Sequence, residues 1–192
     1  RKSGIIESIR MRFLVDSITM LRGSKHWSDE DHAAMKQWFG DFVHWLKTSD
    51  HGMAEAKTEN NHGSWYAQQV VLYSLFAGDE ATALEAIKGV PARIDAQYEP
   101  DGNQPHENKR TRSLHYCDFN NRAMMDIARL AERLGVDLWG YESADGRSVR
   151  RSLDFMVPYM VGEKEWPHKQ IDKPRYEWFA QSFRWAGIGF DE

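Results

Sequence analysis

The chain has 192 residues, of which 41% are hydrophobic and 28% are charged. That length is enough for one sizeable domain with an interior core, and the apolar content excludes a disordered chain. The formal net charge of −4 argues against a broad nucleic-acid-binding surface, because such a surface needs a strong positive excess. Any basic patch must therefore be local.

Cysteine content and hydropathy bear on the cellular compartment and on membrane association. Cys117 is the only cysteine, so no disulfide can form within the chain, which fits both the cytoplasm and the periplasm. No apolar run approaches the roughly 20 residues that span a bilayer, so we expect no membrane partner. The chain begins with Arg1 and shows no signal peptide, so the sequence gives no information on cellular targeting.

The first part of the chain predicts two helices. Apolar residues recur at helical spacing over residues 5–21, and Gly23 follows as a stop signal. Ser28 fits a helix N-cap, and Asp31 three residues later fits a capping box. The helix that follows is rich in aromatic residues, and the polar stretch 48–52 predicts its end.

The stretch Asn60-Asn61-His62-Gly63-Ser64-Trp65 ends a polar run and opens an apolar one. It therefore predicts a helix that starts at the asparagine pair and stops near Gly78. Asp79 is placed to cap another helix through Ile87, and Gly89-Val90-Pro91 predicts a break or a kink.

The longest stretch without periodicity runs from the turn signal Glu99-Pro100-Asp101-Gly102 to Arg112. The clearest helix follows over about residues 114–134, and further helices are predicted over about 149–161 and 176–185. Sustained period-two runs and hairpin signals are lacking. We therefore predict an all-α fold of about seven helices, forming a single domain over residues 1–192.

Two polar stretches that open helices carry the residue types best suited to chemistry. One asparagine suffices as an N-cap, so the second amide of the Asn60-Asn61 pair is free for a ligand carboxylate. His62 can take or give a proton near neutral pH. The second stretch, residues 109–116, supplies guanidinium cations and the phenol of Tyr116.

This set of groups suits the abstraction of a proton next to a carboxylate. That step produces an enolate with added negative charge, which amide, imidazole and guanidinium donors would stabilise as an oxyanion site does. A base removes the proton, and an acid protonates the leaving oxygen. In a uronic-acid polymer these steps cleave the glycosidic bond by β-elimination.

The runs NNHGSWYAQQ and PDGNQPHENKRTRSLHYCDFN resemble motifs of the alginate lyase family of polysaccharide lyases. The resemblance continues through GVDLWGY, DGRS and WPHKQ, and the early LRGS segment echoes it, so it covers most of the chain. It implies part of an incomplete (α/α) toroid, built of helical hairpins with a substrate cleft across one end. It also implies that the chain is the C-terminal portion of a longer catalytic domain, with helices and a lid segment before Arg1.

The same resemblance implies roles for individual residues. Asn61 would help to neutralise the substrate carboxylate, and His62 would neutralise it or act as a base. Tyr116 would be the acid and, in syn elimination, also the base. Arg110 is the predicted neutralising cation, although Lys109 and Arg112 are alternatives. The further predicted substrate-binding residues are Lys109, Arg112, His115 and Trp65.

The resemblance also indicates a partner and a location. The predicted partner is an anionic polysaccharide or oligosaccharide, and because family members act on exported polymers, the predicted location is periplasmic or secreted. The eight histidines show no HExxH pattern, and the proposed elimination needs no metal, so we expect neither a metal nor another cofactor.

Other interpretations remain open from the residues alone. Trp65 could pack in the core, His115 could be a surface residue, and the basic run could simply face water. A glycoside hydrolase would need paired carboxylates across the scissile bond, and a polyuronate-binding fragment without turnover is a third possibility. The carboxylates available near the motifs are Glu55, Glu59, Asp101 and Glu107.

Overall fold

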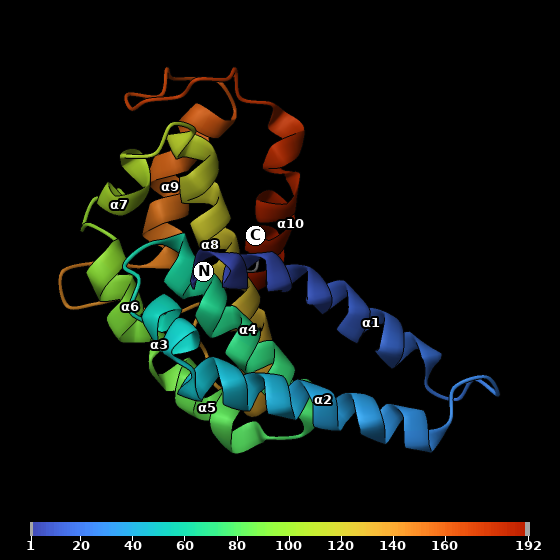
Figure 1. Ribbon diagram of the computed structural model, residues 1–192. Coiled ribbons are helices and arrows are strands. Elements are labelled where there is room, and N and C mark those ends of the chain that lie inside the picture. The colour runs from blue at the N-terminus through green and yellow to red at the C-terminus, as the bar shows by residue number, and fades with distance from the viewer. Residues whose placement is uncertain (1, 191–192) are drawn as a thin grey trace.

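The structure is a computed structural model that describes residues 2–190, with side chains for 4–175 and 177–190 (Figure 1). The helices in chain order, with η marking 3₁₀ segments, are η1 (Lys2–Met11), α1 (Arg12–Leu21), α2 (Asp29–Thr48), α3 (Asp50–Ala56), α4 (Asn61–Ala77), α5 (Glu80–Lys88), α6 (Val90–Gln97), α7 (Pro105–Asn108), α8 (Ser113–Ala131), η2 (Glu132–Leu134), α9 (Val149–Met160), η3 (Tyr176–Trp178) and α10 (Ala180–Gly189). Over these residues no β-strand occurs, only an isolated bridge between Arg112 and Gln170. The all-α prediction is confirmed, whereas closure into a toroid stays a prediction.

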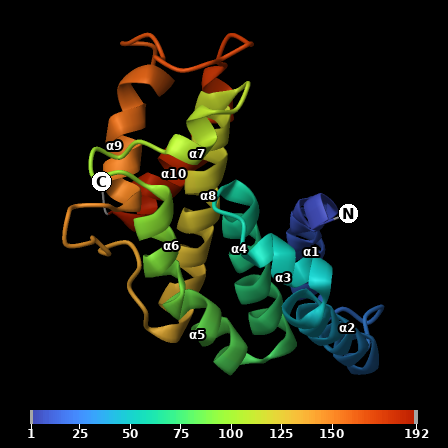
Figure 2. The ribbon, with the colours of Figure 1, turned by 60° about the vertical axis from the view of Figure 1, so that its left-hand side comes forward.

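Helix α4 lies at the centre and packs against α2, α5 and α8. Figures 1 and 2 show α1 and α2 extending away from the body on one side, while α8, α9 and α10 form the other. Val71 of α4 belongs to the core cluster shared with α5, α6 and α8, and Val70 belongs to the cluster shared with α2. Because α4 meets neighbours on opposite sides, it is buried nearly all round instead of along one stripe.

The structure contains short helices that the sequence patterns did not predict. The segment 48–52 was expected to end a helix, and α2 does end at Thr48. The Ser49 hydroxyl then accepts a bond from Gly52 N at 3.1 Å and caps the unpredicted helix α3. Gly89-Val90-Pro91 was expected to break or kink the helix before it, and α5 does end at Lys88. Pro91 lies in the first turn of the next helix, α6, where a missing N–H costs nothing. Both segments are too short for an apolar period to be detected.

The remaining helix boundaries differ by a few residues. The helix expected over 5–21 is split, because a 3₁₀ segment precedes α1. The last α-helix starts at Ala180, four residues after its predicted start at 176, since a 3₁₀ turn lies before it. Gly135 does end the long helix segment, in the left-handed conformation with φ of 69°.

Candidate active site

The start of α4 is organised by its asparagine pair. The Asn60 side chain caps the helix and accepts a bond from the backbone N–H of His62 at 3.1 Å. Asn61 is therefore free for another partner, and that partner is Glu107 of α7. The Asn61 backbone N–H donates to one oxygen of this carboxylate at 2.6 Å, and its side-chain Nδ2 lies 2.9 and 2.8 Å from the two oxygens.

The Asn61–Glu107 pair lies inside the molecule. Asn61 has no exposed surface, and Glu107 is 1% exposed. Burial raises the pKa of the Glu107 carboxyl, while the Asn61 hydrogen bonds and the charges of Arg110 and His62 act in the opposite direction. Arg110 and His62 are thus both near enough to act on the same carboxylate. Glu107 connects the two polar helix starts.

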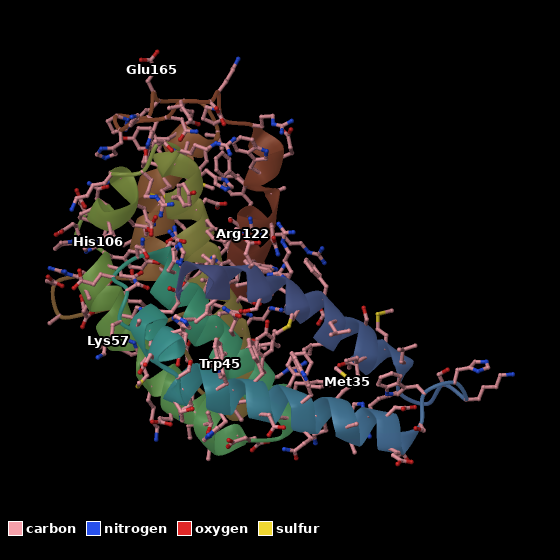
Figure 3. The ribbon with its side chains drawn as sticks, in the orientation of Figure 1. Met35, Trp45, Lys57, His106, Arg122 and Glu165 are labelled. Carbon is pink, nitrogen blue, oxygen red and sulfur yellow. The ribbon has the colours of Figure 1, made fainter. Side chains whose placement is uncertain are left out.

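His62 reaches the surface where Asn61 does not. Its Nδ1 lies 2.6 Å from Oε1 of Glu55, a carboxylate of α3 that is 1% exposed. The side chain of His62 is 21% exposed and lines a cavity of about 720 Å³. Lys57 and His106 line the same cavity and lie on the same side of the molecule (Figure 3). Of the asparagine–histidine pair, only the imidazole is open to a ligand.

The start of α8 places a cation directly on a phenol. The guanidinium carbon of Arg110 lies 3.7 Å from the centroid of the Tyr116 ring. Arg110 follows α7, and its backbone N–H donates to the carbonyl of Glu107 at 2.9 Å, which fixes the turn between the two residues. Tyr116 is half-buried in the first turn of α8. The geometry joins a cation, a phenol and, through Glu107, the imidazole of His62.

The other basic residues of this stretch point elsewhere. Arg112 forms an ion pair with Asp172, and its guanidinium lies 5.3 Å from the Trp178 ring. Lys109 is exposed. Among the three basic residues considered, Arg110 is the one found over the Tyr116 ring, and its role as the neutralising cation stays a prediction.

His115 is part of an aromatic cluster. Its ring stacks on Phe119 and meets the edges of Tyr116 and Trp178. Burial lowers the pKa of His115, and the positive charges of Arg112 and Arg122 lower it further. A substrate contact at His115 stays a prediction.

Trp65 departs from its predicted role. It is 1% exposed, and its ring packs against Phe119 with centroids 4.9 Å apart. A sugar ring would need an open aromatic face, and Trp65 presents none. The structure therefore corrects the assignment of Trp65 to substrate binding and supports the core-packing alternative.

The sequence matches the profile of the family described as alginate lyase over residues 1–166. The chain belongs to the alginate lyase family. The family predicted from the two motifs is thereby confirmed. No curated protein is significantly similar to the chain.

Solved structures agree with the family. This alginate lyase family member is similar to the crystal structure of an alginate lyase from Bacteroides ovatus, with a TM-score of 0.94 and 35% sequence identity. The match covers 100% of this chain and 51% of the other, so the chain spans about half the length of that relative. A variant of alginate lyase A1-III complexed with a tetrasaccharide matches with a TM-score of 0.56 and 20% identity, over 70% of this chain and 41% of that one. The second likeness supports the fold alone.

Sequence patterns missed what Glu55 and Glu107 do in this alginate lyase family member. Both were considered only as hydrolase carboxylates, but each is buried and bonded to one member of the asparagine–histidine pair. Glu59 and Asp101 are exposed. No local pattern identifies a buried carboxylate, although the seven-residue interval from Glu55 to His62 fits a short helix that folds back on the next one.

The described residues contain no group of three or more His, Cys, Asp or Glu side chains arranged to hold a metal ion. The expectation that neither a metal nor another cofactor takes part stays a prediction.

Proposed function

We propose that this chain carries the reacting groups of a polysaccharide lyase that cleaves an anionic uronic-acid polymer, alginate or a similar one, by β-elimination. The observation that carries this proposal is the guanidinium of Arg110, 3.7 Å from the Tyr116 ring. The guanidinium thus holds a positive charge against the ring whose hydroxyl would exchange the proton. Family membership supports the reaction class.

Two side chains are suited to hold the substrate carboxylate. His62 lines an open cavity, and Arg110 offers a forked set of donors that matches a carboxylate. Asn61 was expected to share this task, but it has no exposed surface and directs its amide nitrogen at Glu107. We therefore assign Asn61 a supporting role, in which it ties the start of α4 to α7.

Tyr116 is the proposed acid and base. Its phenolate oxygen takes the proton from the carbon next to the carboxylate, and the electron pair of that C–H bond forms the new carbon–carbon double bond. The bond from the neighbouring carbon to the glycosidic oxygen breaks, and the phenol returns its proton to that oxygen. The positive groups around the carboxylate offset the charge that develops in between.

The direct test is the product. Alginate, polymannuronate, polyguluronate and glucuronan would each be incubated with the protein, and ultraviolet absorbance would report a new double bond. We expect absorbance with at least one polymer, and its loss in His62→Ala but not in His26→Ala, an exposed histidine in the turn after α1. Saturated product ends would indicate a hydrolase instead. Calorimetric binding without product would indicate a binding fragment.

The location and the partner follow from this function as proposals. A polymeric uronate is too large and too charged to cross a bilayer unaided, so we propose a periplasmic or secreted enzyme with an anionic polysaccharide as its partner and no nucleic acid. Within residues 2–190, none of the helices combines the length and the apolar character required to cross a membrane. Cell fractionation of the source organism tests the location.

A further inference from the structure

Glu55 is a buried carboxylate with a partner at the proposed site. It is 1% exposed, and in the described part of the chain its only side-chain bond is the 2.6 Å contact with His62 Nδ1. A carboxylate removed from water is costly unless a positive or hydrogen-bonding group compensates for it. The imidazole of His62 supplies that compensation.

The local fold is built to keep these two groups together. Helix α3 ends one turn before α4 begins, and Arg93 of α6 donates to the carbonyls of Ala56 and Thr58 in the connection. Gly63 lets the start of α4 approach closely, because a Cβ atom there would overlap Thr58 and the Arg93 guanidinium. The Glu55–His62 contact is thus imposed by tight packing of the connection.

Charges of both signs lie near His62, including the guanidinium of Arg93 at the connection and that of Arg110, which acts on Glu107. Glu55 of α3 bonds to the ring directly, and the Glu107 carboxylate of α7 interacts with it electrostatically. The connection and α7 contribute the remaining groups that share the cavity, which are Lys57, Glu59 and His106. Lys57 and Glu59 are exposed, so water screens them more than it screens the two buried carboxylates.

We propose that Glu55 is a positioning residue that keeps His62 as an imidazolium, with Nδ1–H bonded inward and Nε2–H free to donate to the substrate carboxylate. This inference rests on the proposed lyase function and divides the work of the site. His62 neutralises the substrate carboxylate and does not act as the base. Tyr116 alone moves the proton.

The variant Glu55→Gln tests this division, because it preserves the shape and removes the charge. We expect kcat/KM relative to wild type to fall about 10- to 100-fold at about pH 8 but less than about 3-fold at about pH 5.5, where an ordinary imidazole is protonated without help. The matched control is Glu85→Gln on α5, which removes a carboxylate from the exposed ion pair between Glu85 and Lys47. It should show no such dependence on pH. An equal loss at both pH values would overturn the proposal, because a purely structural role is not rescued by acid.

A measurement on the wild-type protein covers the case in which the variant does not fold. Nitrogen NMR of labelled histidine, assigned with His62→Ala, should show both ring nitrogens of His62 protonated at about pH 7. An unprotonated Nε2 there would overturn the inference. Failure of the proposed lyase function can be distinguished from failure of this inference, because wild-type protein would then form no unsaturated product at any pH.

Discussion

The two polar helix starts look alike in sequence but are built differently. At the start of α4, Asn60 caps the helix and buried carboxylates hold Asn61 and His62. At the start of α8 the cap residue Arg112 makes no side-chain cap bond, and the Gln170 side chain accepts from Leu114 N instead. Arg110 lies over the ring of Tyr116. Buried carboxylates hold the polar groups at the start of α4, whereas at the start of α8 cations lie on aromatic rings near the surface.

The polar groups at the start of α4 are held in place, whereas the proposed reactive group, the Tyr116 phenol, lies at the start of α8. The His62 ring and the amide nitrogen of Asn61 have partners already and need little reorganisation when a substrate carboxylate arrives, which is how an electrostatic site gains its effect. The phenol at α8 has a cation against its ring face, and its hydroxyl is the proposed proton carrier. The tests below probe the α8 side and the buried residues that frame the site.

The largest expected effect is at Tyr116. Tyr116→Phe removes the only proposed proton carrier and should lower kcat by about 10²- to 10⁴-fold, the usual contribution of acid–base catalysis. Circular dichroism should show unchanged helix content. Tyr141→Phe, which loses only an exposed bond to Asp95, serves as the control. Full activity of Tyr116→Phe would remove the α8 start from the chemistry.

A smaller loss is expected when the cation on the phenol is removed. Arg110→Gln should reduce kcat/KM by about 10²- to 10³-fold, because one preorganised positive group is lost. Arg112→Gln is the matched control, since Arg112 is paired with Asp172, and its loss should cost less than about 10-fold. A reversed order would transfer the neutralising role to Arg112.

A buried acid on α8 provides a contrast with Glu55 and Glu107. Asp118 accepts a hydrogen bond from Ser182 of α10, and burial raises its pKa to about 6. The folded state therefore binds this proton more tightly than the unfolded state, so the contribution of Asp118 to stability is full below about pH 4 and is lost as pH rises through about 6. Relative to wild type, Asp118→Asn should gain on the order of 2 kcal/mol between about pH 4 and 7, measured by urea unfolding.

The control for this gain is Asp154→Asn, which changes an exposed carboxylate on α9 and should show no trend with pH. Turnover of Asp118→Asn should keep the pH profile of wild type. A shift in that profile would mean that the interior of α8 takes part in the chemistry.

The smallest expected effect concerns Trp65. Trp65→Phe should leave KM for the polymer unchanged and lower the free energy of unfolding by on the order of 1 kcal/mol, because a buried ring is replaced by a smaller one. A raised KM at unchanged stability would restore Trp65 as a substrate contact.

Long periodic segments made most of the fold predictable. Helices α2, α4 and α8 have caps or stops that agree with the pattern, such as Ser28 with its capping box and Gly135 in the left-handed conformation. The short helices α3, α6 and α7 were missed, because their start depends on packing and on single bonds such as the one from Gly52 to Ser49.

The sequence also predicted part of the candidate site. The residue types and the family motifs singled out His62, Arg110 and Tyr116, and the structure brings Arg110 onto Tyr116. Two other features depended on residues far away in the chain. Asn61 is held by Glu107, which leaves Asn60 as the cap, and Trp65 packs in the core against Phe119.

By itself the sequence determined the helical class and the family, because both follow from local periodicity and from short motifs. Only the tertiary structure decided that Asn61 is sealed against Glu107 and that His62 rests on Glu55. The reason is physical, since the ionic state and the orientation of a polar side chain depend on the charges and the water around it. Those surroundings come from α3 and α7, which no pattern near the motif describes.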